Sequence, residues 1–172
     1  MEQVRPKYDR VSRALHWLSA FVIIWAAFSG IYIASMSVNE HWRQVIGEFN
    51  VSLTTVFIPF FIWRVTNILC KKAPPYGSML SDNQVLVAKI AHLFMYVLIT
   101  IVLVTGVLMM PHEFSVFGVF KVPQLIHNEI ALDKFKHVHF ISSQMLAAAV
   151  LLHVLAVAKH EFNGNSVLRR MF

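Results

Sequence analysis

Residues 85–110 read VLVAKIAHLFMYVLITIVLVTGVLMM, and Lys89 is the only charged residue among them. A stretch of about 20 apolar residues is long enough to cross the roughly 30 Å hydrocarbon layer of a membrane as an α-helix. Residues 15–35, 49–69 and 139–158 have the same character. A spanning segment must satisfy its own backbone hydrogen bonds, so the sequence predicts four membrane helices.

The composition agrees with this prediction. Apolar residues make up 57% of the 172 positions and charged residues 14%, whereas soluble domains average about 45–50% and about 25%. We expect an all-α, integral membrane four-helix bundle that forms a single domain. The first apolar stretch is too long for a cleavable signal peptide and lacks a small-residue cleavage motif, which indicates a signal anchor. The expected helix bounds are about 10–35, 47–70, 84–110 and 137–160.

The positive charges are distributed unevenly between the two ends of these helices. Of the 15 Lys and Arg residues, eleven fall on the side that holds both termini, and the positive-inside rule therefore places both termini in the cytoplasm. The basic residues flank apolar segments and form no basic face with interleaved aromatics, which favours anionic lipid over nucleic acid as a partner. The eleven are Arg5, Lys7, Arg10, Arg13, Arg64, Lys71, Lys72, Lys89, Lys159, Arg169 and Arg170, and the other four are Arg43, Lys121, Lys134 and Lys136.

Histidines inside the apolar stretches carry the functional signal, because ionisable residues within a membrane are costly and usually functional. His16 lies near the cytoplasmic start of the first helix, and His153 lies at a matching depth near the cytoplasmic end of the fourth. Two neutral imidazoles facing each other across a bundle are what bis-histidine haem ligation needs. His139 precedes His153 by 14 residues, which places it within about 40° of the same face and roughly 21 Å away. That spacing suits a second haem near the opposite membrane face.

The alternative for any single histidine is an interfacial side chain that forms hydrogen bonds at a helix end. We keep that interpretation for the five histidines of the connectors and helix ends. No HExxH motif or cluster of carboxylates supports a zinc site, and the one cysteine, Cys70, excludes an internal disulfide. The five histidines are His41, His112, His127, His137 and His160.

Several motifs together resemble the bacterial cytochrome b561 family. They are DRVSRALHWL at residues 9–18, KIAHL at 89–93, FSVFG at 114–118 and VLRRM at 167–171, with His139 and His153 between the last two. The resemblance covers nearly the whole chain and extends to the b-type cytochrome subunits of hydrogenases and formate dehydrogenases. It implies haem b as cofactor and a location in the bacterial inner membrane.

In that family four histidines hold two haems. The resemblance assigns the cytoplasmic pair to His16 and His153, and it places the outer pair at His139 and at the position occupied here by Asn50. Asparagine is not a normal haem ligand. Three alternatives therefore stay open for the outer site: no haem, a five-coordinate haem on His139 alone, or a replacement ligand from the connector, such as His112 or His127.

Two further residues are candidates for cofactor binding. Arg64, near the cytoplasmic end of the second helix, could pair with a propionate of the inner haem, or serve only as a positive-inside anchor. His92 matches a recurrent family histidine outside the usual ligand set. It could bond a propionate, serve a quinone headgroup or a proton path, or be a helix-end histidine satisfied by water.

The resemblance implies an electron-transfer protein that exchanges electrons with the quinone pool, passing them from superoxide or a periplasmic donor to ubiquinone. As an enzyme it would be a quinone-linked oxidoreductase. The alternative from another class is a non-catalytic membrane anchor or haem-binding sensor. Its periplasmic redox partner would dock on residues 111–136, the longest connector.

Overall fold

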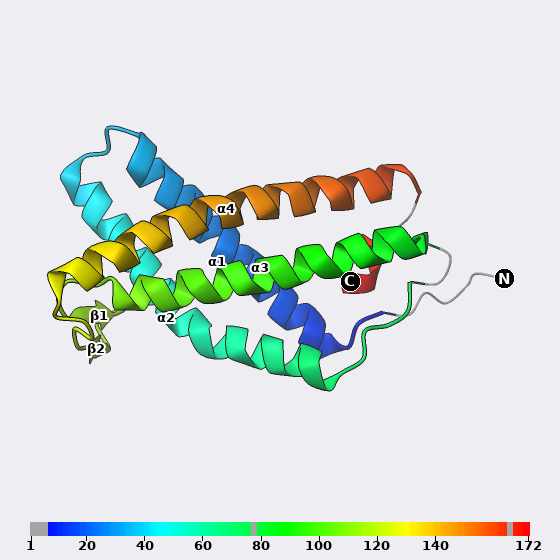
Figure 1. Ribbon diagram of the computed structural model, residues 1–172, viewed down its shortest axis with the longest axis horizontal. Coiled ribbons are helices and arrows are strands. Elements are labelled where there is room, and N and C mark those ends of the chain that lie inside the picture. Colours follow the sequence, from blue (N-terminus) through cyan, green and yellow to red (C-terminus); the bar gives the residue numbers. More distant parts are fainter. Residues whose placement is uncertain (1–6, 77–78, 165–166) are drawn as a thin grey trace.

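The computed structural model describes residues 7–76, 79–164 and 167–172. Arg5, counted above among the cytoplasmic charges, lies outside the described residues. Four helices are long and apolar enough to cross a membrane, which confirms the predicted four-helix architecture. In chain order the elements are α1 (Arg10–Ser35), α2 (Glu40–Cys70), α3 (Asp82–Leu108), β1 (Phe114–Val116), β2 (Phe120–Val122), α4 (Glu129–Phe162) and the 3₁₀-helix η2 (Leu168–Met171) (Figure 1).

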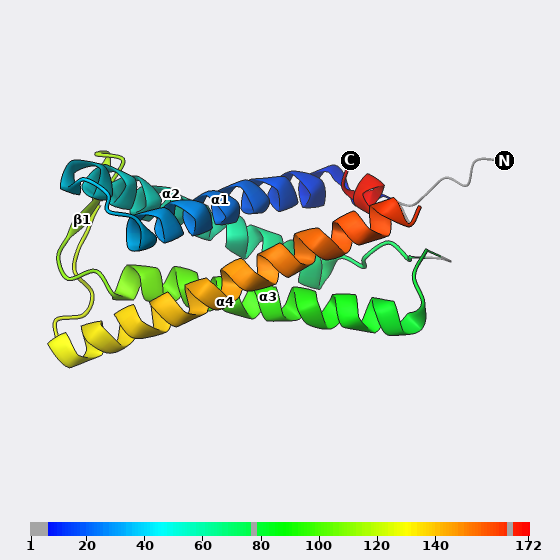
Figure 2. The same ribbon diagram turned by 90° about the horizontal axis from the view of Figure 1, so that it is seen from above.

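The four helices pack as two pairs, α1 with α2 and α3 with α4. Figure 2 shows one pair lying over the other, with the segment that carries β1 at one end of both. Apolar side chains from all four helices meet at mid-length and hold the two pairs together. This core cluster consists of Val22, Phe57, Phe61, Leu98, Ile99 and Leu146.

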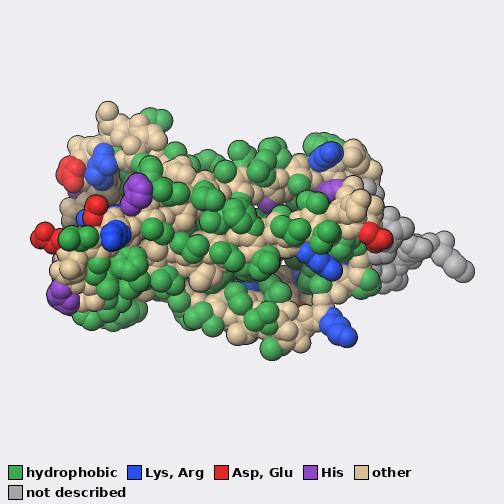
Figure 3. Space-filling model, in the orientation of Figure 1, with side chains coloured by type: hydrophobic (Ala, Val, Ile, Leu, Met, Phe, Trp, Pro, Cys, Tyr) green, Lys and Arg blue, Asp and Glu red, His purple; other side chains and the backbone are tan. Residues whose placement is uncertain are grey.

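The outward faces of the helices are apolar as well. Large side chains such as Phe21, Phe28 and Leu69 are 64%, 73% and 80% exposed. Figure 3 shows apolar side chains along the whole length of the visible face, with the charged ones gathered toward its two ends. So extensive an apolar surface is unfavourable in water and favourable against lipid, which agrees with a bundle that spans the membrane.

Two helices begin earlier than the sequence predicts. α2 starts at Glu40 and not near residue 47, and α4 starts at Glu129 and not near residue 137. The side chains of Asn39 and Asn128 each accept a hydrogen bond from a backbone N–H in the first turn that follows. Such caps start a helix in polar sequence, so these two helices extend beyond the apolar stretches.

A two-stranded antiparallel hairpin, β1 with β2, interrupts the long connector and was not predicted. Its turn uses Phe117 and Gly118 at positive φ, 49° and 71°. The buried hydroxyl of Ser52 on α2 accepts from the backbone N–H of Phe117 at 3.1 Å and donates to the carbonyl of Ser115 at 3.3 Å. The hairpin is thereby fixed to α2, the neighbour of α1, while the chain continues into α4 of the other pair.

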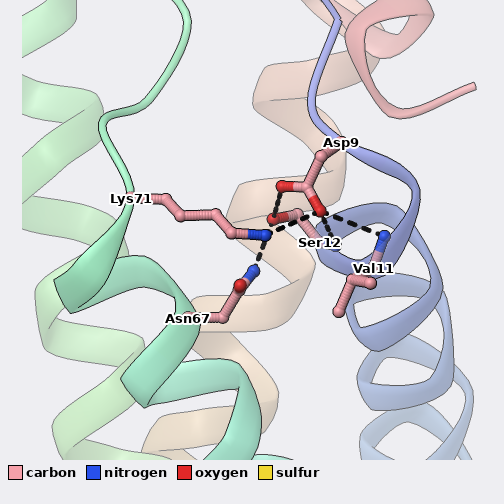
Figure 4. Close-up of polar contacts among 5 residues, drawn as sticks. All are labelled: Asp9, Val11, Ser12, Asn67 and Lys71. Atoms are coloured by element: carbon pink, nitrogen blue, oxygen red, sulfur yellow. Dashed lines mark hydrogen bonds and ion pairs between the residues drawn. The ribbon is translucent and has the colours of Figure 1, made fainter.

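At the opposite end a polar cluster ties the start of α1 to the end of α2 (Figure 4). The Asp9 carboxylate accepts from Lys71 Nζ at 3.0 Å and from the Ser12 hydroxyl at 2.6 Å. Asn67 Nδ2 donates to the same hydroxyl at 2.7 Å. Hydrogen bonds from Ser12 and Lys71 hold the pKa of Asp9 well below its usual range, so the carboxylate stays ionised in mild acid and the cluster is lost only in stronger acid.

The C-terminal segment docks at this same end. The Tyr8 N–H donates to the carbonyl of Arg170 at 3.1 Å, and the Trp17 indole N–H donates to that of Met171 at 2.9 Å. The Arg170 guanidinium is almost fully buried and stacks 3.9 Å from the ring centre of Tyr76, in the α2–α3 connector. The described parts of both chain ends therefore lie together at one end of the bundle.

Candidate functional site

The core cluster sets a register that locates the polar interior residues. Val22, Phe57, Ile99 and Leu146 come one from each helix and belong to the same cluster. A shift of seven residues along a helix moves about 10 Å along the axis and returns to within about 20° of the same face. Each helix therefore places one residue in the bundle interior seven positions before its core residue and one seven positions after it. These residues form two further layers, one on each side of the core cluster.

The inner layer lies toward the end where the chain termini meet. Counting seven residues from the core gives Leu15, Arg64, His92 and His153, and His16 adjoins Leu15. All three histidines and Arg64 are half-buried. Four helices thus bring three imidazoles and one guanidinium to a single depth.

Contacts in the inner layer link both helix pairs. The His92 and His153 rings, from α3 and α4, meet edge to face with centroids 5.3 Å apart. Arg64 Nη2, from α2, lies 2.9 Å from Nδ1 of His16 on α1. The Arg64 guanidinium also reaches Tyr96 on α3, and this hydrogen bond links the two helix pairs.

Arg64 is turned into the bundle interior. Its Nε donates to the Tyr96 hydroxyl at 3.0 Å, and its Nη1 reaches the carbonyls of Leu15 and His16 at 3.5 and 3.4 Å. A guanidinium can only donate, so Nδ1 of His16 accepts in this arrangement. Tyr96 was not singled out from the sequence, because nothing in its own helix marks it as the partner of an arginine on α2.

The outer layer lies on the other side of the core. Counting seven residues in the opposite direction gives Ser29, Asn50, Gly106 and His139. His139 and His153 thus occupy different layers, as their 14-residue spacing predicts. Every member of this layer except His139 is small or carries an amide.

The His139 ring is fixed by α3. Its Nδ1 lies 3.1 Å from the carbonyl of Val102 and 3.2 Å from the Thr105 hydroxyl oxygen. A carbonyl only accepts, so the hydrogen-bond network assigns the ring proton to Nδ1 and leaves the Nε2 lone pair free. This is the tautomer that metal-binding histidines adopt when a backbone carbonyl orients them.

Gly106 allows this close approach of the two helices. A Cβ on Gly106 would lie 3.2 Å from Cε1 and 3.5 Å from Nδ1 of His139. Any larger residue would press on the ring. Neither Thr105 nor Gly106 was singled out from the sequence, although their seven-residue spacing from Leu98 and Ile99 is a signal that could have found them.

Asn50 is engaged with α1. Its Oδ1 accepts from the Trp25 indole N–H at 2.9 Å, and its Nδ2 lies 2.8 Å from the Ser29 hydroxyl. The Asn50 amide, at the position where the motif resemblance implies an outer ligand, therefore forms a hydrogen-bonded group with the neighbouring helix.

The other histidines lie outside both layers. His41, His112, His127 and His137 are exposed, and His160 is half-buried near the end of α4. Within the described chain neither His112 nor His127 makes a hydrogen bond or ring contact with an outer-layer residue. The structure therefore gives a replacement ligand from the connector no support.

These residues fit a b-type haem. Haem iron binds neutral imidazole, and the interior supplies imidazoles at two depths about 21 Å apart, with a cationic group at the inner one. Within the described residues no hydrogen bond reaches Nε2 of the outer imidazole, and a Cβ on Gly106 would crowd its ring. A membrane-spanning four-helix bundle with such an interior defines the class of membrane-bound b-type cytochromes.

Comparisons with known proteins agree. The sequence matches the family described as prokaryotic cytochrome b561 over residues 7–172, and the chain therefore belongs to that family. It is 26% identical over 176 residues to "Cytochrome b561 homolog 2" of Escherichia coli (strain K12), which covers 96% of this chain and 90% of that protein. The resemblance drawn from the motifs is confirmed. Membership supports a multi-pass inner-membrane protein with a b-type haem and a role in electron transfer.

Proposed function

We propose that the inner layer carries a low-spin haem b ligated by His16 and His153, and that this haem exchanges electrons with the quinone pool. The observation that supports the proposal most is the placement of His16, His92 and His153 in one layer of the bundle interior, with the rings of His92 and His153 in contact. The haem supplies reversible one-electron chemistry. The protein's own contribution is ligand identity, burial and hydrogen bonding.

His92 is assigned a different role from His153. Its ring packs against that of His153 and, within the described residues, forms no hydrogen bond. We assign His92 to a quinone headgroup or its proton path, because a neutral imidazole can accept a proton as a quinol is oxidised. The ligand role stays with His153, which matches the family's ligand on the fourth helix.

Arg64 is proposed to hold a propionate of the inner haem. If Nε2 of His16 held the haem iron, the ring proton would be on Nδ1, which could then no longer accept from the Arg64 guanidinium. Arg64 must therefore find another acceptor. A propionate is suitable, because charge-assisted pairs with arginine are the strong ones, and Tyr96 already orients the guanidinium from its other edge.

The test of quinone exchange is reduction of the purified oxidised protein by a soluble ubiquinol analogue in stopped flow. We expect His92→Gln to leave the low-spin spectrum intact and to slow haem reduction about tenfold or more, as loss of a general base does. His137→Gln, an exposed histidine on α4, is the matched control and should reduce at the wild-type rate. If His92→Gln reduced as fast as wild type, His92 would have no part in the quinone reaction.

We also propose that both termini, and with them the inner layer, face the cytoplasm. Eleven of 15 Lys and Arg residues fall on that side. Reporter fusions after Phe172 and before Met1 should report the cytoplasm. Fusions after Val38, between α1 and α2, and after Gly118, in the hairpin, should report the periplasm. A periplasmic signal from the C-terminal fusion would overturn this topology.

The electron donor on the outer side is proposed from the family resemblance as superoxide or a periplasmic redox protein. A second candidate function, as a membrane anchor or sensor for such a partner, is favoured by one observation. Phe117, Val119 and Phe120 of the hairpin are 50%, 82% and 51% exposed, which gives the outer end an apolar projection within residues 111–136. An anchor without electron transfer would bind its partner with the haem in either oxidation state and would not be reduced by quinol.

A further inference from the structure

We propose that the outer layer binds a second b-type haem through His139 alone, and that the opposite coordination position of its iron is open to a small exogenous ligand. The proposal rests on the haem-binding function proposed above, but not on which residues ligate the inner haem. It chooses among the three alternatives that the sequence leaves for the outer site.

The first support is the state of the His139 ring. The Thr105 hydroxyl donates its own proton to the carbonyl of Ile101 at 2.6 Å, so its oxygen can accept from His139. Nδ1–H then has two acceptors, Thr105 and the carbonyl of Val102. The Nε2 lone pair points away from both, and within the described residues no donor contacts it. A half-buried imidazole held in this way is prepared to donate a lone pair to iron.

The second support is the close contact between the His139 ring and Gly106 on α3. Because Gly106 has no side chain, the imidazole lies close against α3, and a Cβ there would come within 3.2 Å of its Cε1 and push the ring away. Glycine within a helix costs about 1 kcal/mol relative to alanine. Gly30 on α1 and Gly47 on α2 both have open space where a Cβ would be, so the close contact with a histidine ring distinguishes Gly106 from them.

The third support is the residue on α2 in the outer layer, across the bundle from His139. The family's ligand position on α2 holds Asn50, whose amide is bonded to Trp25 and Ser29 on α1. Among the described residues the outer layer contains no imidazole other than His139. Within the described residues, an iron held by His139 would therefore find one protein ligand in this layer.

Carbon monoxide distinguishes the two layers. It binds ferrous haem with an open axial position and does not displace two histidines from a low-spin haem on the same time scale. We expect the full-length protein, purified in detergent, to contain two haems b per chain by the pyridine haemochrome assay. After reduction with dithionite, carbon monoxide should shift the spectrum of about half of the haem.

Two variants locate the responding haem. His139→Ala should lower the haem content to one per chain and abolish the carbon monoxide response, while the sharp α-band of the inner haem persists and shows that the bundle is intact. Gly106→Ala should weaken the response, because the new Cβ displaces the ring, whereas the matched control Gly30→Ala should respond as wild type does.

One haem per chain without a carbon monoxide response in the wild-type protein would overturn the proposal. A carbon monoxide response that survives in His139→Ala would also overturn it. An undiminished response in Gly106→Ala would show that the close contact between Gly106 and the His139 ring is not needed for haem binding. The ligands of the inner haem are tested separately by the sharp α-band. If their assignment were wrong, this band would be absent from the wild-type protein or would survive in His16→Ala.

Discussion

Replacing His16 or His153 with alanine is expected to remove the low-spin haem signal from the protein while the chain still inserts into the membrane. The two imidazoles come from α1 and α4 and lie in the same layer of the bundle, so each loss would leave the inner iron with one protein ligand. Insertion depends on the four apolar helices, which neither substitution changes. The measurement is the α-band of the dithionite-reduced protein per chain. We expect a fall to less than about a tenth of the wild-type amplitude, because a haem with a single histidine ligand no longer gives the low-spin band.

Control variants separate ligation from general damage. His137→Ala and His41→Ala remove exposed histidines from α4 and α2, and both should keep the full spectrum. His92→Ala should also keep the α-band, because His92 is assigned to quinone and not to iron. If the α-band survived in both His16→Ala and His153→Ala, the ligand assignment would be wrong.

The second large effect is expected from Asn50→His. The substitution places an imidazole in the outer layer on α2, at the position where the motif resemblance implies the second outer ligand. The outer haem should change from a form that binds carbon monoxide to a low-spin form that does not, with haem content unchanged at two per chain. The measurements are the carbon monoxide difference spectrum and the α-band amplitude, which should about double.

This change has a structural cost, because Trp25 and Ser29 lose the amide that bonds them to α2. About 1 kcal/mol for each lost hydrogen bond is expected, which a bundle of this size can tolerate. Asn50→Gln is the control: it keeps an amide that is not a haem ligand, and the carbon monoxide response should remain. Two haems with an unchanged response in Asn50→His would show that residue 50 does not face the outer iron.

The helices could be predicted from hydropathy because a membrane span has a nearly fixed length. α1 has the expected bounds, and all four spans are where the apolar stretches place them. The early starts of α2 and α4 could not be read in the same way. Asn39 and Asn128 cap turns that lie in polar sequence, where hydropathy gives no signal.

The hairpin was missed for a similar reason. Its strands have three residues each, too few for an alternating pattern to stand out. Its place in the fold depends on the buried hydroxyl of Ser52, more than 60 positions earlier in the chain. Only tertiary structure brings these segments together.

Sequence periodicity gave the faces and depths of the candidate site but not its partners. The spacing of His139 and His153 predicts two layers about 21 Å apart, and the helix register agrees. Which side chain from another helix meets each histidine is not encoded in the spacing. The pairings of Arg64 with His16 and of Thr105 with His139 required the packed bundle.

A low-spin haem b in the inner layer is the property on which the proposed electron transfer depends. The most direct test is the optical spectrum of the wild-type protein purified from membranes, oxidised and then reduced with dithionite, with a pyridine haemochrome assay on the same sample. We predict a sharp reduced α-band and a haemochrome of the b type. A protein that is folded and inserted but lacks the α-band, showing no haem or only a broad high-spin spectrum, would contradict the account.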